Sequence, residues 1–132
     1  MAELMKLQVI CPDRMFYEGE VSMVELNTTE GEIGIYPKHI PMTCIIAPGV
    51  LTITEAEGLK NAALHSGFIQ ILPEKVTILA EAAEWPHEID VDRAEAARGR
   101  AEERIRTRDS KTDIARAETA LQRAVARINI IK

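Results

Sequence analysis

The chain has 132 residues, of which 46% are hydrophobic and 28% are charged, a balance that is typical of a folded protein and excludes wholesale disorder. Aromatic residues make up only 4% and the net charge is −5, which argues against a base-stacking platform and against general nucleic-acid binding. Residues 1–86 have five Lys/Arg against twelve Asp/Glu, whereas residues 87–132 have eleven against nine. This uneven charge indicates two modules.

Residues 1–86 contain short apolar runs, several of them alternating, separated by Pro, Gly and Asn turn signals. Many short strands at this spacing predict an antiparallel β-sandwich or flattened barrel. Cys11 and Cys44 lie in such runs without metal-binding spacing, and we interpret them as small apolar residues. No apolar run approaches the roughly 20 residues that cross a bilayer, so any membrane association is expected to require a partner. The predicted strands are 6–11, 21–26, 33–36, 42–46, 49–54, 61–65, 67–72 and 75–81.

Pro86 ends the strand pattern, and residues 87–132 have the period of two amphipathic helices. A turn is predicted over 107–113, with Ser110 or Thr112 capping the second helix. Asp90 or Asp92 is expected to cap the first, and Asp92 with Glu95 has the spacing of a capping box. Five of the eleven apolar positions are alanine and bury little area, so the hairpin is predicted to be marginally stable and easily detached. These positions are Val91, Ala94, Ala97, Ala101 and Ile105, then Ile114, Ala117, Leu121, Ala124, Val125 and Ile128.

Four arginines border these apolar positions, two on each predicted helix. Arg93 and Arg100 are seven residues apart, and Arg123 and Arg127 are four apart, so each pair shares one helix face. An antiparallel hairpin would bring the pairs together, and guanidiniums donate in a fork that suits phosphate oxygens. The alternative is that these arginines are solvated and paired with nearby glutamates. Neither a phosphate-binding glycine loop nor a defensible catalytic or metal-binding group is present, which argues against an enzyme.

The segments "GEIGIYPKHIPM" and "SGFIQILPEKVTILAEAAE", in a β-domain followed by a helical hairpin, resemble the epsilon subunit of bacterial F-type ATP synthases over the whole chain. Lys38, at a position often filled by a small residue, and Gly99, within a helix that is usually uninterrupted, depart from the family. The resemblance implies a sandwich of about ten strands over 1–86 and a hairpin over 87–132. The sandwich would dock on the gamma subunit and the c-ring, and the hairpin would reach the alpha and beta subunits and inhibit ATP hydrolysis.

Some members of that family bind ATP on the compact hairpin through a motif of the form I/L-D-x-x-R-A, to which "IDVDRA" at 89–94 is similar. The resemblance implies that the arginines contact the phosphates, and that the other residues contact the nucleoside. It leaves open whether Mg²⁺ takes part. The implied ATP-binding residues are Glu84, Ile89, Asp90, Arg93, Ala94, Arg100, Arg123 and Arg127.

These features predict a non-catalytic, regulatory subunit located peripherally at the cytoplasmic side of the cell membrane, without a transmembrane segment of its own. Two alternatives remain at this point. The first is a purely structural stalk subunit that binds no nucleotide. The second is a free-standing β-sandwich that binds a ligand and has a helical tail.

Overall fold

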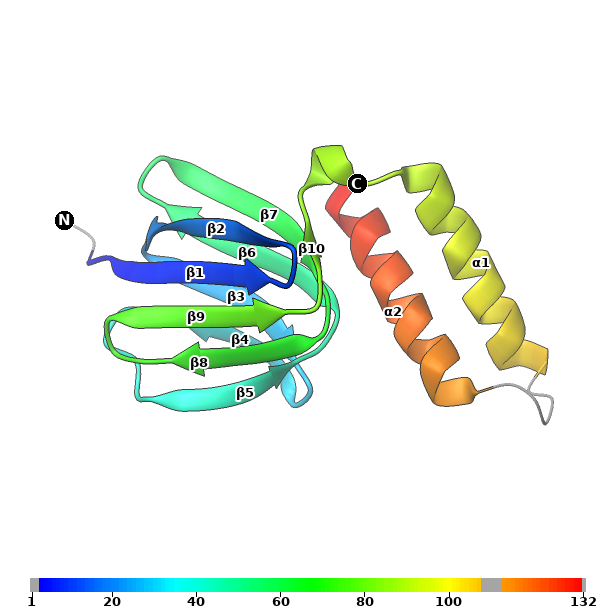
Figure 1. Cartoon of the computed structure of the whole chain (residues 1–132), viewed down its shortest axis with the longest axis horizontal. Helices are drawn as coiled ribbons and strands as arrows, with labels where there is room; N and C mark the ends of the chain where they lie inside the picture. Colours follow the sequence, from blue (N-terminus) through cyan, green and yellow to red (C-terminus); the bar gives the residue numbers. More distant parts are fainter. Residues whose placement is uncertain (1–2, 108–112, 132) are drawn as a thin grey trace.

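The computed structural model describes residues 3–107 and 113–131, which form a β-unit flanked by a pair of antiparallel helices (Figure 1). This confirms the predicted sandwich followed by a hairpin. The strands are β1 (Met5–Cys11), β2 (Arg14–Val21), β3 (Met23–Thr28), β4 (Gly31–Ile35), β5 (Met42–Ile46), β6 (Gly49–Glu55), β7 (Gly58–Leu64), β8 (Gly67–Ile71), β9 (Lys75–Ala80) and β10 (Ala83–Glu84). A 3₁₀ helix, η1 (Pro86–Glu88), leads to α1 (Val91–Thr107) and α2 (Ile114–Ile131).

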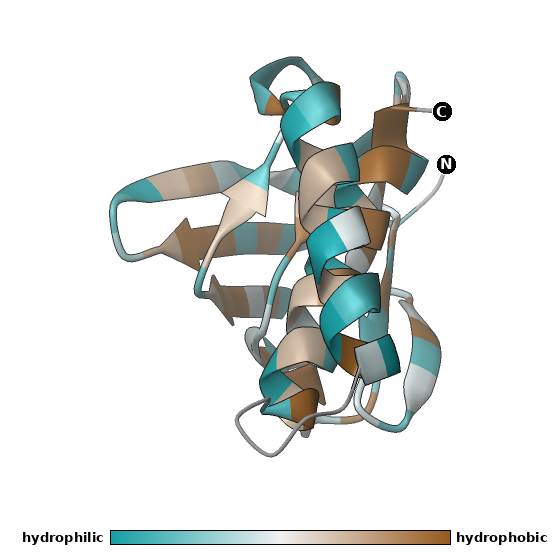
Figure 2. Ribbon diagram, turned by 90° about the vertical axis from the view of Figure 1, so that its right-hand side faces the viewer, coloured by the Kyte–Doolittle hydropathy of each residue, from teal (hydrophilic) through white to brown (hydrophobic). Residues whose placement is uncertain are grey.

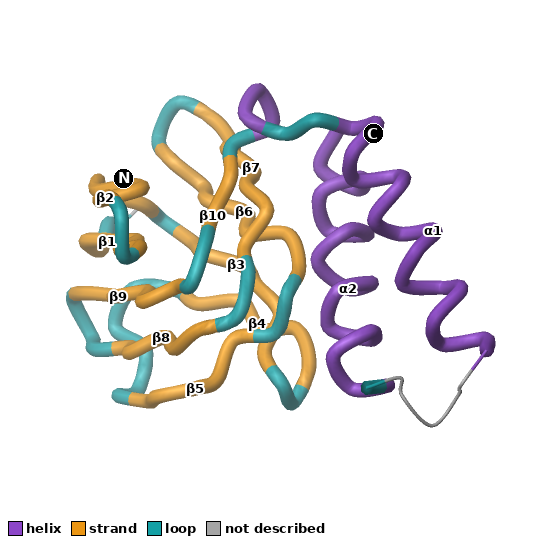
Figure 3. Tube along the Cα trace, turned by 45° about the vertical axis from the view of Figure 1, so that its right-hand side comes forward, coloured by secondary structure: helices purple, strands orange, loops and turns teal. Residues whose placement is uncertain are grey.

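The ten strands form one continuous hydrogen-bonded sheet in the order β10-β7-β6-β3-β5-β8-β9-β1-β2, with β4 paired to β3. The sheet folds over on itself into two layers (Figure 3). All pairs are antiparallel except β1 with β9, which is parallel and aligns Leu7 with Val76. The predicted antiparallel sandwich is confirmed for the other strand pairs, and this pair is the exception. No hairpin joins these strands, since most of the sandwich lies between them in sequence, so the connection imposes no antiparallel direction.

The apolar core lies between the layers and is supplied by inward-facing residues such as Leu7, Leu26, Leu51 and Ile69, each at most 1% exposed. Every fully buried member of this core lies between Met5 and Ala83. The hairpin contributes one partly buried residue, Ile130 of α2, which packs against this core, so the sandwich supplies nearly all of it.

The hairpin buries mainly alanine, as predicted. Its buried apolar residues are Ala94, Ala101, Ala117, Ala124, Ala126 and Ile128. Viewed from the hairpin side, the helix nearest the viewer alternates between hydrophilic and weakly hydrophobic positions, and the C-terminal end of α2 is strongly hydrophobic (Figure 2). The predicted caps Ser110 and Thr112 lie outside the described residues, and Asp113 caps α2 by accepting the Arg116 N–H at 3.0 Å. None of the described helices is both long and apolar enough to cross a bilayer.

Lys38, in the loop between β4 and β5, adopts a left-handed backbone with φ of 66°. Its N–H donates to the Pro73 carbonyl at 2.7 Å, which ties this loop to the turn between β8 and β9. A left-handed backbone strains any residue with a Cβ, so glycine is the small residue that suits this position best.

Lys38→Gly is expected to give a higher free energy of unfolding than Lys38→Ala, by about 1 kcal/mol. Both variants remove the exposed ion pair between Lys38 and Glu3, so their difference isolates the backbone strain. Urea unfolding measures it. Equal stability of the two variants would show that the loop relaxes without cost.

Candidate functional site

The segment that joins the sandwich to α1 is fixed to β2. Arg14 Nη1 and Nη2 each donate to the Glu88 carboxylate at 2.8 Å, and Nη2 also donates to the Ala83 carbonyl at 3.1 Å. The hydrogen bond from Arg14, together with the Trp85 N–H, lowers the pKa of Glu88 to about 2. Trp85 stacks on Phe16 with ring centroids 4.3 Å apart. The linker up to Glu88 is thus held on the sandwich, and Ile89 is the first residue beyond these contacts.

Asp90 caps α1. Its Oδ1 accepts the Arg93 N–H at 3.1 Å, and its carbonyl accepts the Ala94 N–H at 3.0 Å. Of the two aspartates predicted for this role, the structure selects Asp90. The capping box predicted from Asp92 and Glu95 is wrong, because Asp92 already lies within the first turn of the helix.

Glu84, in the last strand β10, is hydrogen-bonded to the C-terminal half of α2. Its Oε1 accepts hydrogen bonds from Arg127 Nε at 2.6 Å and from His65 Nε2 at 2.9 Å. Burial would raise the pKa of Glu84, but the hydrogen bonds from Arg127 and His65 outweigh it, so the pKa is lowered. The carboxylate is therefore ionised at neutral pH and binds the hairpin to the sandwich.

A cavity of about 390 Å³ lies where the linker, α1 and α2 meet, and its volume is in the range of small-molecule sites. Six of the eight predicted site residues line it. The lining residues are Glu84, Glu88, Asp90, Arg93, Ala94, Ala97, Arg100 and Arg127. Three of the four arginines thus lie together, as their helical spacing predicted. Glu88 and Ala97 were not predicted to line the site, and only Ala97 had a signal in the sequence, as a residue of the predicted apolar stripe.

Two of the predicted site residues do not line this cavity. Ile89 is half-buried in the linker, and Arg123 is directed to the sandwich, where its Nη2 donates to Glu81 at 2.8 Å. Arg123 lies one turn before Arg127 on α2, so it remains near the site without facing it in this conformation.

The cavity has an excess of free hydrogen-bond donors. Arg14 and Arg127 neutralise its two glutamates, and Asp90 is occupied with the helix cap. Arg93 and Arg100 are exposed, and within residues 3–107 and 113–131 neither forms an ion pair. The alternative of pairing with glutamates holds for Arg123 and Arg127, which pair with Glu81 and Glu84, whereas Glu95 and Glu102 pair with Arg98. Two unpaired guanidiniums beside Arg127 are suited to binding an oxyanion such as a phosphate chain.

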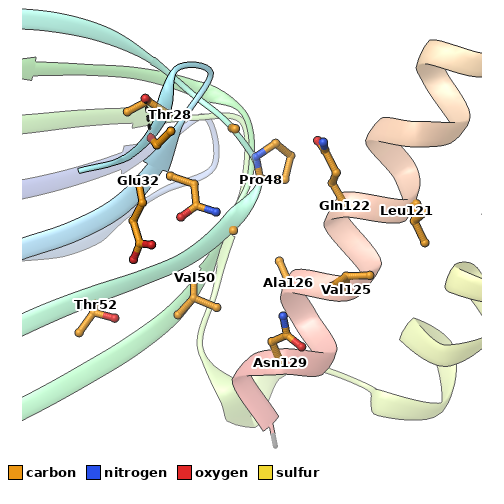
Figure 4. A pocket seen from close by; sticks show the side chains of 14 residues that line it. Thr28, Glu32, Pro48, Val50, Thr52, Leu121, Gln122, Val125, Ala126 and Asn129 are labelled. Carbon is orange, nitrogen blue, oxygen red and sulfur yellow. Dashed lines mark hydrogen bonds between the residues drawn. The ribbon is translucent and has the colours of Figure 1, made fainter. Parts of the chain in front are cut away.

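A second, larger cavity of about 620 Å³ separates α2 from the sandwich (Figure 4). It is lined by uncharged residues, including Asn27, Gln122 and Asn129, together with the carboxylate of Glu32. Its lining has no cationic group, so it is unsuited to phosphate. In the part of the chain that the structure describes, no cluster of three or more His, Cys, Asp or Glu could hold a metal ion.

Family models match both parts of the chain: residues 4–86 match the β-sandwich domain of the ATP synthase delta/epsilon chain, and residues 87–132 match its long α-helix domain. The chain is 47% identical over 125 residues to the ATP synthase epsilon chain of Caldanaerobacter subterraneus, covering 94% of this chain and 91% of that one. It is 42% identical over 133 residues to the epsilon chain of Clostridium kluyveri, covering all of both chains.

Solved structures show the same fold. A chain of the Euglena gracilis mitochondrial ATP synthase, in a structure of its OSCP, F1 and c-ring, superimposes with a TM-score of 0.80 at 23% identity. The match covers 90% of this chain and 76% of that one. A chain of the Tetrahymena thermophila central stalk and c-ring gives 0.59 at 13% identity, covering 98% and 95%.

Proposed function

Since the chain belongs to the ATP synthase delta/epsilon chain family, as a non-catalytic epsilon subunit of the central stalk, we propose that its hairpin inhibits ATP hydrolysis and that ATP opposes this inhibition. The sandwich would couple the gamma subunit to the c-ring, at the cytoplasmic side of the membrane. ATP would bind the compact state described above and keep the hairpin on the sandwich. No catalytic role is proposed for any residue of the site.

The observation that carries the ATP proposal is the cavity at the junction of the sandwich and the hairpin. Its arginines come from both helices, and Glu84 comes from the sandwich. A ligand bound there touches all three elements, so it stabilises only the arrangement in which they meet. Arg93, Arg100 and Arg127 would bind the phosphates, with Arg123 within reach if it exchanged Glu81 for the ligand. Glu84, Ile89, Asp90 and Ala94 would lie at the nucleoside end.

Three features support a detachable hairpin. The sandwich supplies every fully buried residue of its core, the fully buried apolar residues of the described hairpin are five alanines and one isoleucine, and a cavity remains between α2 and the strands. Two of the ion pairs across this interface, from Arg123 and Arg127, are partly exposed, and such pairs contribute about 1 kcal/mol or less each. A ligand that binds only the compact state adds about 2.7 kcal/mol at a hundredfold excess over its Kd. This is comparable to the interface terms, so ATP could decide the state of the hairpin.

A row of exposed apolar side chains crosses five adjacent strands of the sandwich and supports docking on the gamma subunit. Ile45, Phe68, Leu79 and Met15 are each at least 50% exposed, and Ile10 joins them in register. A continuous apolar surface of this kind marks an interaction site. It lies on the sandwich alone, so it would remain covered by a partner when the hairpin moves.

The inhibitory role is tested by deleting residues 90–132, which leaves the pair between Arg14 and Glu88 intact. The assembled complex with the truncated chain is expected to hydrolyse ATP several-fold faster than the complex with the full chain, because the inhibiting segment is gone. The measurement is steady-state hydrolysis, with subunit stoichiometry after purification as the control for assembly.

Two other results of this deletion would contradict the proposal. Unchanged hydrolysis in a fully assembled complex would favour the purely structural stalk subunit. Loss of the truncated chain from the complex would place the docking contacts on the hairpin instead of the sandwich.

A further inference from the structure

His65, in the turn between β7 and β8, is a buried ionisable group that does not line the junction cavity. Its side chain is buried, with the residue 1% exposed, and its backbone N–H donates to the Ala82 carbonyl at 3.0 Å. Its Nε2 lies 2.9 Å from Glu84 Oε1, which as a carboxylate oxygen only accepts, so Nε2 carries the proton. Its Nδ1 is buried and has no hydrogen-bond partner among the described residues. The ring is thus a neutral imidazole whose one hydrogen bond among the described residues is the one to Glu84.

His65 and Arg127 donate to the same oxygen of Glu84, so the three side chains form one unit, here called the Glu84 junction. The charged groups that face His65 are Glu84 of β10, and Arg123 and Arg127 of α2. Arg123 is itself paired with Glu81. Protonation of Nδ1 would bury a donor without an acceptor and would place a third cation beside two arginines.

We propose that neutral His65 is a positioning residue that fixes Glu84 for Arg127, and that its protonation releases α2 from the sandwich. Loss of α2 removes both arginines and exposes the junction to water, which accommodates the imidazolium. The inference rests on the part of the proposed function in which the hairpin can detach, and it is independent of nucleotide binding. Acidification would then act on the hairpin in the direction opposite to ATP.

The pKa of His65 in the compact state is lowered, as this proposal requires. Burial lowers the pKa of His65, the charges of Arg127 and Arg123 lower it further, and the hydrogen bond with Glu84 opposes them only in part. In the detached state the burial and both arginines are lost, so the pKa rises and that state binds the proton more readily. The stabilisation of docking by neutral His65 is therefore fully present above the pKa of the detached state. It is lost as pH falls through that value toward the lower pKa of the compact state.

The test is a pH titration of the full-length, ¹⁵N-labelled chain without nucleotide, followed by NMR from pH 8 to pH 5. The imidazole nitrogens of His65 are expected to report the neutral Nε2–H tautomer at pH 7.5. The docking equilibrium, read from the amide signals of Ala124 and Ala126, is expected to fall several-fold between pH 7.5 and pH 5.5. The matched variant is His65→Gln, whose side-chain amide can still donate to Glu84 but does not titrate in this range. It is expected to remove this transition while the hairpin stays docked.

A charged His65 at pH 7.5, or the same pH response in His65→Gln, would overturn the inference. So would titration of His65 without movement of α2. The wild-type titration needs no variant, so a His65→Gln chain that failed to fold would still leave a decisive result. Because no nucleotide is present, a failure to bind ATP leaves this result unaffected, and the hydrolysis assay tests inhibition separately.

Discussion

Arg127→Gln is expected to weaken ATP binding to the isolated chain by about tenfold to hundredfold. Arg127 lines the junction cavity and donates from Nε to Glu84 at 2.6 Å, so it contributes both to the phosphate site and to the docking of α2. A hydrogen bond that involves a charged group contributes about 1.5–3 kcal/mol. Glutamine keeps a donor of shorter reach and removes the charge, so the affinity is expected to fall by the corresponding factor.

The measurement is a calorimetric titration with ATP, and the matched control is Arg116→Gln. Arg116 lies on the same helix, is exposed and does not line the cavity, so this variant removes the same charge away from the site. Hydrogen exchange of α2 without ATP separates the loss of docking from the loss of direct contact. Equal losses in both variants would indicate a general charge effect, and unchanged affinity in Arg127→Gln would refute the assignment of the site.

The strands that the sequence predicts are those with regular alternation or long β-branched runs, such as 6–11 and 49–54. β2 was missed because its pattern is broken: Phe16 and Tyr17 are adjacent and both buried. The pairing of β1 with β2 shifts register between Val9 and Ile10, and such a bulge turns two consecutive side chains inward. A tertiary pairing causes this irregularity, so no local period could reveal it.

The candidate site was predictable to the extent that it depends on helical geometry. The seven-residue spacing of Arg93 and Arg100 and the antiparallel hairpin place them near Arg127, and the cavity contains all three. The ion-pair partners of Glu88 and Arg123 were not predictable, because Arg14 is 74 residues from Glu88 and Glu81 is 42 residues from Arg123. The burial of Ala126 was also not predicted. One apolar stripe accounts for one buried face of a helix, whereas α2 packs against the sandwich as well as against α1 and so buries a second face.

Gly67→Ala is expected to lower the free energy of unfolding by about 2–4 kcal/mol, a large part of the stability of a domain of this size. Gly67 begins β8 and pairs with Ile46 on one side and Ala80 on the other. A Cβ on Gly67 would lie 2.0 Å from the Leu79 carbonyl oxygen and 2.8 Å from the Ala80 Cα. Both are backbone atoms of β9, so the clash can be relieved only if β8 and β9 separate. The separation would occur at the end of β9, just before β10 and Glu84.

Gly34→Ala is the matched control, because the nearest atom to a Cβ on Gly34 is the flexible Glu25 Cγ at 3.9 Å. Its effect is expected to stay within about 0.5 kcal/mol. Urea unfolding can be followed by the fluorescence of Trp85, the one tryptophan of the chain, which stacks on Phe16 of the sandwich. If the two variants unfolded at the same urea concentration, a side chain would fit between β8 and β9, which would contradict the close contact predicted at Gly67. A shift in Gly67→Ala alone would show that their close approach depends on the missing side chain.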